Sequence, residues 1–163
     1  MPGILEDNQM FYQEWEPKQT HRFMMFINDI PSYIVKATDR PKLQISETEH
    51  AHINVTRYVA SKGKWDPISV TLYDPIDNSG TQAVMNWVRS CFESATGRMG
   101  YSNFYKKEIK LNALGPAGDI VEEWILKGAW ITNPDFGALN WEDEGQKVEI
   151  TLNIRFDYAV LNF

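Results

Sequence analysis

Two histidines at alternate positions are the residues of this sequence whose spacing most suggests chemistry. If the segment around His50 and His52 is a strand, both imidazoles point to the same side and supply half of a typical metal site. A third ligand is not evident, because His21 is distant and the sequence has neither an HExxH motif nor a second cysteine. We interpret the pair as exposed histidines in a polar segment, and we expect no bound metal and no cofactor.

The single cysteine and the acidic residues do not form a catalytic arrangement either. Cys91 follows Trp87 and Val88 on the expected apolar side of a helix, where a thiol behaves as a small core residue and has no base beside it. The acidic clusters coincide with turn and loop signals, where carboxylates cap helices and stay solvated. We therefore expect that this protein is not an enzyme.

Charge and composition exclude further classes of function. The formal charge of −6 argues against a protein that grips nucleic acid, since such binding relies on clustered Lys and Arg. A lone cysteine forms no internal disulfide, and no stretch approaches the roughly 20 apolar residues of a membrane span, so we expect no membrane insertion. An aromatic content of 13%, with six Trp, favours association surfaces beyond one small core.

The elements that would position these residues are mostly strands. Residues 23–27 are apolar on both faces and predict a buried strand, which a turn connects to a second strand at 33–38 in an expected hairpin. Between 39 and 63 the pattern weakens, and we expect a long excursion containing strands, of a length that is usually functional in a compact domain. Residues 65–73 alternate and predict a strand with one face on the core.

One amphipathic helix is predicted after this strand. Its apolar stripe is expected to lie in the core and consists of Val84, Trp87, Val88 and Cys91. Residues 79–82 have the form of a capping box at its start, and Gly97 offers a left-handed stop at its end. Further strands are expected at 105–111 and from 120 past Gly128 to Thr132, after which Pro134 breaks the ladder because it lacks an amide proton.

The clearest alternation in the sequence covers residues 147–158. Its apolar face contains Val148, Ile150, Leu152, Ile154, Phe156 and Tyr158, of which the first five are expected in the core. Its polar face is expected to look toward solvent or a lumen and contains Lys147, Glu149, Thr151, Asn153, Arg155 and Asp157. A strand of about twelve residues, roughly 40 Å, is long for a small domain. We therefore expect adjoining copies of the chain to share its edge.

These patterns predict a mainly β fold. Strands on both sides of one helix, without βαβ alternation, favour two packed antiparallel sheets, sandwich-like or barrel-like, with one flanking α-helix. Residues 1–20 mix prolines, acidic residues and aromatics and are interpreted as an N-terminal arm. Residues 21–163 are interpreted as a single β domain.

The order of these motifs resembles the tail tube proteins of T4-like contractile-tailed bacteriophages, which belong to one superfamily with the secretion-system tube protein. The matching segments are Lys36, Ala37, Thr38 and Pro41, residues 65–71, Trp87, residues 127–134, residues 139–143 and residues 148–158. The resemblance covers the chain from about His21 onward.

The resemblance implies a structural protein of the virion. Six copies would form a ring whose inner sheets close into one barrel, and stacked rings would form the inner tail tube. The implied partners are other copies of the chain, the tail sheath, the tape-measure protein and the baseplate and tail-terminator proteins. DNA would pass through without specific binding, and assembly would occur in the host cytoplasm. The excursion would reach the next ring through Leu43, Ile45, Glu47, Glu49, Ile53 and Val55.

Two alternatives remain open. The first keeps the fold and makes the chain a baseplate or tail-terminator ring that does not polymerise. The second is a small β-barrel protein that binds a ligand or a metal through His50 and His52.

Overall fold

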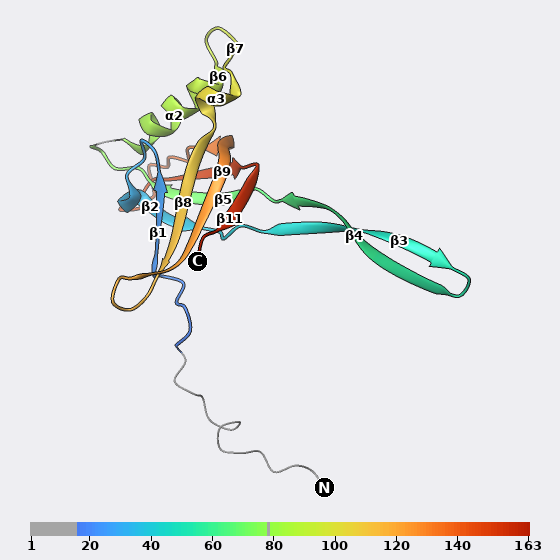
Figure 1. The fold of residues 1–163 in the computed structure, drawn as a ribbon. Coiled ribbons are helices and arrows are strands. Elements are labelled where there is room, and N and C mark those ends of the chain that lie inside the picture. The colour runs from blue at the N-terminus through green and yellow to red at the C-terminus, as the bar shows by residue number, and fades with distance from the viewer. Residues whose placement is uncertain (1–15, 78) are drawn as a thin grey trace.

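The alternating segments of the sequence become strands in the computed structural model, which describes residues 16–77 and 79–163 (Figure 1). The strands are β1 (Phe23–Ile27), β2 (Val35–Thr38), β3 (Leu43–His52), β4 (Val55–Trp65), β5 (Ile68–Tyr73), β6 (Phe92–Glu93), β7 (Arg98–Met99), β8 (Lys107–Leu114), β9 (Ile120–Asp135), β10 (Glu149–Arg155) and β11 (Tyr158–Leu161). The helices are the 3-10 helix η1 (Ser32–Ile34), α2 (Gly80–Cys91) and the single turn α3 (Ser102–Tyr105). The prediction of a mainly β protein with one substantial helix is confirmed.

Seven of these strands form one antiparallel network in the order β1-β8-β9-β10-β5-β2, with β11 also paired to β9. The first half of β9 pairs with β8 and β11, and its second half pairs with β10. Two sheets therefore share β9: one contains β1, β8 and β11, and the other contains β10, β5 and β2. In the described registers β1 and β2 end the network, so the chain by itself does not close a barrel.

Strand β9 passes from one sheet to the other at Gly128. Lys107 pairs with Ala129 and Ile109 pairs with Leu126, so β9 has one residue more than β8 between these two pairs. The extra residue is a β-bulge, which shifts the alternation so that Leu126 and Ala129 are both fully buried. Gly128 has a φ of +67°, and a Cβ atom there would lie 2.2 Å from Asp157 Oδ2. The bulge therefore requires glycine at this position.

The last segment follows the same edge of β9 throughout, with Arg155 opposite Trp130 and Tyr158 opposite Lys127. It is interrupted at Phe156 and Asp157, opposite the bulge. The expected unbroken strand over residues 147–158 is therefore wrong. Strand β10 starts two residues later than expected, and Tyr158, which was placed on the apolar face, is half exposed.

The edges of β10 also differ from the prediction. Strand β5 pairs with one edge of β10 and β9 with the other, both within the same chain. The expectation that adjoining copies share the edge of this strand is therefore wrong for Glu149–Arg155. In the described registers, the open edges of this network belong to β1, β2, β11 and the second half of β9.

The core fills the space between the two sheets and α2. Strands β5 and β10 alternate strictly between buried and half-exposed or exposed positions, because alternate side chains of a strand point to opposite faces. The largest fully buried side chains are Met25, Ile68, Leu72, Ile109, Leu126, Ile150, Leu152 and Ile154. Strand β1 buries only one face, since Met24 and Phe26 are exposed, so it is not the doubly buried strand that was expected.

The first turn of helix α2 is capped by the side chain of Asp74, which lies upstream in the sequence. Ser79 occupies the N-cap position without a side-chain cap, and Asp74 at the end of β5 accepts hydrogen bonds from the Thr81 amide (3.3 Å) and the Thr81 hydroxyl (2.6 Å). Ser79 Oγ also donates to Asp74 (3.3 Å). Burial alone would raise the pKa of Asp74, but these hydrogen bonds hold the pKa below its ordinary value. The carboxylate thus binds the helix start to the sheet.

Three local predictions fail for identifiable reasons. Helix α2 ends at Cys91, and Gly97 (φ +70°) instead lies in the turn between β6 and β7. Pro134 lies inside β9, in the part of the strand that pairs with β10 on one edge only. No strand within the described residues pairs with the other edge there, so the missing amide proton breaks no hydrogen bond on that edge. Strands β1 and β2 do not form a hairpin, because η1 separates them and they pair with β8 and β5.

Candidate assembly surfaces

The most exposed part of the described chain is the hairpin arm, residues 43–65, formed by β3 and β4 (Figure 1). In the described registers these strands pair only with each other, from Leu43 opposite Trp65 to His52 opposite Val55. Every residue of the two strands is exposed except Trp65, which is half-buried. The arm extends well away from the body, so no other segment within residues 16–77 and 79–163 covers it.

Apolar side chains remain on this arm without cover. Among the residues expected to contact another ring, Ile53 is 91% exposed and Ile45 61%, and Leu43, Glu47, Glu49 and Val55 are exposed as well. Tyr58 and Val59 are also exposed, although the sequence patterns did not single them out. They pair with Glu49 and Thr48 across the hairpin, which the register alone reveals. Contiguous exposed apolar side chains are typical of association surfaces.

The two histidines lie on this arm. His50 faces Arg57 and His52 faces Val55, and both are exposed. Within residues 16–77 and 79–163, no cluster of three His, Cys, Asp or Glu side chains could hold a metal ion. Of the ligands that the metal-binding alternative needs, the described residues therefore supply only the imidazoles of His50 and His52.

Aromatic and ionic contacts join the arm to the body. The Trp65 ring lies 5.9 Å from the Phe156 ring and 6.4 Å from the Trp124 ring, centroid to centroid. Arg40, just before β3, is 3.3 Å from a carboxylate oxygen of Glu122 on β9. These contacts fix the base of the arm, while its tip at Ile53 remains free of the body.

Glu122 is a buried carboxylate with several donors. Its side chain is 7% exposed and pairs with Lys18, with Arg40 and with the Trp124 indole N–H. Burial favours a raised pKa, but the hydrogen bonds from Lys18 and Trp124 and the charges of Lys18 and Arg40 hold the pKa of Glu122 below its ordinary value. The carboxylate therefore connects three segments: the residues before β1, the base of the arm and β9.

A polar sheet face lies on the side of β5 and β10 that points away from the core. Its polar members are Ser69, Thr71, Tyr73, Asn133, Asp135, Glu149, Thr151, Asn153 and Arg155, and Trp130 lies opposite Arg155 on the same face. Lys36 of β2 pairs with Glu149, and Lys147 lies 5.1 Å from the centroid of the Tyr73 ring. The hydrogen bond to Glu149 raises the pKa of Lys36 against the opposing effect of burial.

The members of the predicted polar face are all solvent-accessible, although not all lie on β10. Lys147 precedes the strand and Asp157 follows it at the interruption. Asp157 accepts hydrogen bonds from Lys106 Nζ at 2.8 and 2.9 Å. On the opposite face Ile150, Leu152, Ile154 and Phe156 are buried, and Val148 is half-buried.

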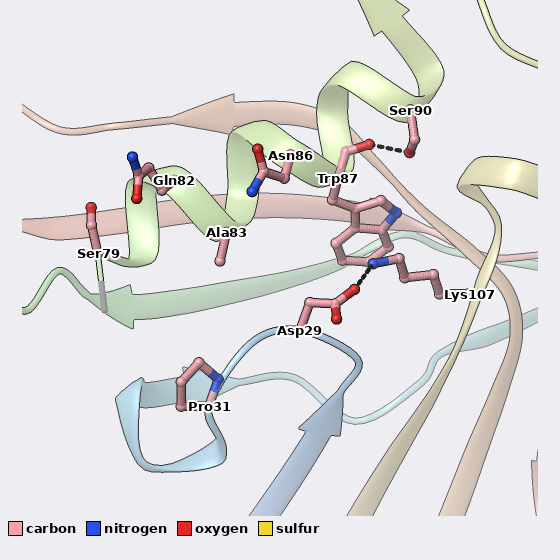
Figure 2. A pocket seen from close by; sticks show the side chains of 9 residues that line it. All are labelled: Asp29, Pro31, Ser79, Gln82, Ala83, Asn86, Trp87, Ser90 and Lys107. Atoms are coloured by element: carbon pink, nitrogen blue, oxygen red, sulfur yellow. Dashed lines mark hydrogen bonds and ion pairs between the residues drawn. The ribbon is translucent and has the colours of Figure 1, made fainter. Parts of the chain in front are cut away.

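A pocket of about 720 Å³ lies between α2 and the turn after β1 (Figure 2). Lys107 Nζ forms an ion pair with Asp29 (2.9 Å) and lies 5.1 Å from the centroid of the Trp87 ring. The Trp87 indole donates to the Tyr105 carbonyl (2.7 Å), which fixes the ring. The polar groups of the lining include Ser79 and Ser90, and its lysine is already paired with Asp29. These contacts hold the helix against the sheets.

The predicted core stripe of α2 is buried over part of its length. Val84 and Trp87 are buried, whereas Val88 and Cys91 are half-buried because the helix end rises away from the sheets. None of the described helices is long and apolar enough to span a bilayer. Most of the predicted N-terminal arm, residues 1–20, lies outside the described residues. Lys18 in its last part contacts Glu122.

No protein-family model and no curated protein matches this sequence. Solved structures match its fold. A chain in the cryo-EM structure of the anti-feeding prophage cap, the tube-terminating cap, has a TM-score of 0.76 at 11% identity, over 97% of this chain and 99% of that chain. A chain in the sheath/tube terminator of the PVC extracellular contractile injection system, in the extended state, has a TM-score of 0.76 at 12% identity, over 93% and 100%.

A chain in the extended PVC sheath-tube complex also matches, with a TM-score of 0.71 at 12% identity, over 98% of this chain and 99% of that chain. At these identities the comparisons establish the fold alone. The chain thus has a fold found in the tube, cap and terminator assemblies of contractile injection systems. This group is broader than the T4-like phage tail tubes that the sequence motifs resemble.

Proposed function

We propose that this chain is a structural subunit whose copies form hexameric rings in the inner conduit of a contractile tail or injection machine. The observation that carries the proposal is the hairpin arm, which exposes Leu43, Ile45, Ile53 and Val55 and is covered by no other part of the chain that the structure describes. Such an arm needs a neighbour to bury its apolar side chains. The shared fold with tube, cap and terminator chains supports the same role.

The open edges of the sheets supply a second kind of contact between copies. An unpaired edge presents free amide and carbonyl groups and invites another strand. Because both edges of β10 are occupied, we assign the expected continuation of the sheet to β1, β2 and β11 instead. Joining such edges around six copies would close the barrel that the isolated chain leaves open.

We assign the polar sheet face to the wall of the conduit. A wall that lets DNA slide must not gather cations, because clustered Lys and Arg would hold the phosphates. The face comes close to this condition, since Glu149 and Asp135 offset two of its three cations, Lys36, Lys147 and Arg155. Partners outside the wall would include a sheath, as in the sheath-tube complex that the fold resembles.

Two positions along the conduit fit this role. The motif order of the sequence favours the repeating tube of a phage tail, whereas the higher TM-scores, 0.76 against 0.71, favour a terminal ring such as a cap or terminator. A tube subunit must offer contacts on both ring faces, and a terminal ring must leave one face unable to continue the stack.

Electron microscopy of the purified full chain tests the proposal and separates the two positions. Stacked tubes across a concentration series indicate the tube body, and single rings that never stack indicate a terminal ring. Mass photometry should give a hexamer as the smallest assembled species. A chain that remains monomeric at all concentrations and in the presence of crowding agents would contradict both assignments.

A further inference from the structure

The outer part of the hairpin arm, residues 47–60, has two faces of opposite charge. Its register is unbroken from Glu47 opposite Ala60 to His52 opposite Val55. Residues directly opposite each other share a face, and the face alternates along each strand. The acidic face therefore contains Glu47, Glu49, Ala51, Thr56, Tyr58 and Ala60. The basic face contains Thr48, His50, His52, Val55, Arg57 and Val59.

The inner part of the arm continues this division. The register shift leaves its extra residue on β4, in the stretch that contains Lys62. Strand β3 therefore keeps its alternation, and Gln44 lies on the basic face with its partner Lys64. The cations Arg57 and Lys64 thus share one face of the hairpin, and the carboxylates Glu47 and Glu49 share the other.

These charges are available for contacts with another molecule. Within the described residues no ion pair involves a residue of the arm, and all four charged side chains are exposed. Each face also carries uncovered apolar side chains, Tyr58 (60% exposed) on the acidic face and Val55 (60%) and Val59 (52%) on the basic face. Each face therefore combines unpaired charge with apolar surface, as association surfaces do.

The two faces of the arm are complementary to each other. In a twofold contact between two arms, each copy would present the same face, so that like charges would meet. A heterologous contact, with the basic face of one arm on the acidic face of another, brings Arg57 and Lys64 toward carboxylates instead. Heterologous contacts generate rings when the rotation closes. The charge pattern of the arm therefore favours a ring over a twofold dimer.

The arm is long enough for such a contact but too narrow to hold a ring by itself. Its strands of 10 and 11 residues span about 35 Å, and a body of about 120 residues has a radius of gyration of about 14 Å. The arm is thus about as long as the body is wide (Figure 1). One face of residues 47–60 covers roughly 250 Å², against the roughly 800 Å² per partner of a stable interface. The open strand edges must supply the rest.

We infer that, in each pair of neighbouring copies, the basic face of one arm packs on the acidic face of the other. This inference rests on the proposed ring assembly and names one contact within it. The two hairpins pack face to face about 10 Å apart, with the side chains of both faces between them. Val55 and Val59 of one copy cover Tyr58 of the next, and the flanking charges select the opposite face.

Two charge reversals test the pairing. Arg57→Glu and Glu49→Lys change exposed residues, so each variant should melt like the wild type. Each variant alone brings like charges together and should raise the concentration for half-assembly in mass photometry by about 10-fold or more. An equal mixture of the two variants should assemble like the wild type, because every contact in an alternating ring joins opposite charges. Native mass spectrometry should then find mainly hexamers with three copies of each variant.

Glu93→Lys and Arg98→Glu are the matched controls. These residues face each other on the exposed strands β6 and β7, so the same charge changes occur outside the arm and should leave assembly unaltered. Single arm variants that assemble like the wild type, a mixture that does not recover, or controls that lose assembly equally would overturn the inference.

Crosslinking identifies the occupant of the acidic face in the full chain. Benzoylphenylalanine replaces Tyr58, equal amounts of ¹⁵N-labelled and unlabelled chains are mixed before assembly, and the crosslinked residues are identified by mass spectrometry. We expect mixed-isotope crosslinks to Thr48, Arg57 or Val59. Crosslinks confined to one copy, or to the body of another copy, would overturn the inference. A wild-type chain without rings would refute the proposed function itself, whereas rings with crosslinks elsewhere would refute only this contact.

Discussion

Strands β5 and β10 form an antiparallel pair, and so do the two strands of the hairpin arm. The two pairs differ in how far their faces are buried. In β5 and β10 one face is fully buried under α2 and the other sheet, and the other face is polar. In the arm both faces are exposed, although Leu43, Ile45 and Val55 are apolar. Alternation therefore predicts which side chains share a face, while burial depends on whether a second layer lies over that face. The body carries the stability, and the arm is available for contacts with other molecules.

The largest effect should come from a charge in the body. Ile150→Asp places a carboxylate at a fully buried position of β10 without a partner, and we expect a loss of about 4 kcal/mol or more and no soluble folded protein. Asn153→Asp, on the polar face of the same strand, is the matched control and should fold normally. Soluble yield and circular dichroism measure both. Equal tolerance of the two substitutions would contradict the assignment of the faces.

A smaller but still large effect should follow from Gly128→Ala. The substituted residue would keep a φ near +67° and place its Cβ against Asp157, so we expect a loss of roughly 3 kcal/mol or more in the free energy of unfolding. Gly118→Ala is the control, because Gly118 also has a positive φ (+83°) but open space around it, and about 1–2 kcal/mol is expected there. Urea titrations give both values. Similar losses would mean that the bulge is not tightly packed.

An intermediate effect should appear at the junction between β5 and α2. Asp74→Ala removes the acceptor for Thr81 and Ser79 and should cost about 1–2 kcal/mol at pH 7. Because the folded-state pKa of Asp74 is lowered, its contribution is complete above the unfolded-state pKa of about 3.9 and is lost as the pH falls through the folded-state pKa.

The difference in stability between wild type and Asp74→Ala should therefore shrink on acidification from about pH 5 to pH 2. Thermal melts over this range measure it. Asp77→Ala, an exposed carboxylate in the same connection, is the control and should leave the melting temperature unchanged at every pH. A difference that stays constant with pH would show that the Asp74 side chain acts through packing alone.

The smallest effect on stability should come from the arm. Tyr58→Ser and Val59→Ser remove exposed apolar side chains, and each should change the free energy of unfolding by less than about 0.5 kcal/mol. The same variants should weaken or abolish assembly seen by electron microscopy, because the arm makes its contacts with other copies. Unimpaired assembly in both variants would remove the arm from the interface and weaken the contrast with the body.

Features that depend on one helix or strand were easier to predict from the sequence than features that depend on contacts between two elements. The faces of β5 and β10 follow from alternation, and the start of α2 was placed correctly within a residue. The interruption at residues 156 and 157 was not foreseen, because its partner is a bulge at Gly128 on β9, almost thirty residues away. The capping role of Asp74 was missed for the same reason, since a capping residue is sought next to the helix and not across a connecting loop.

The candidate surfaces show the same division. A long excursion with strands was expected from the sequence and its contacts with another ring from the resemblance, but its register, with a shift between Ile45 and Glu47, required the paired strands. The contacts of the buried Glu122 could not be predicted from the sequence, because 104 positions separate Lys18 from Glu122. Only the packing of the residues before β1 against β8 and β9 brings them together.

Strand β9 gives the molecule a mechanical property that neither sheet would have alone. Because one continuous backbone of 16 residues belongs to both sheets, the sheets cannot slide apart without stretching covalent bonds or tearing several ladders at once. We therefore expect a single cooperative unfolding transition for the body, without a state in which one sheet melts before the other. Pulled from either side, such a body transmits force as a rigid unit.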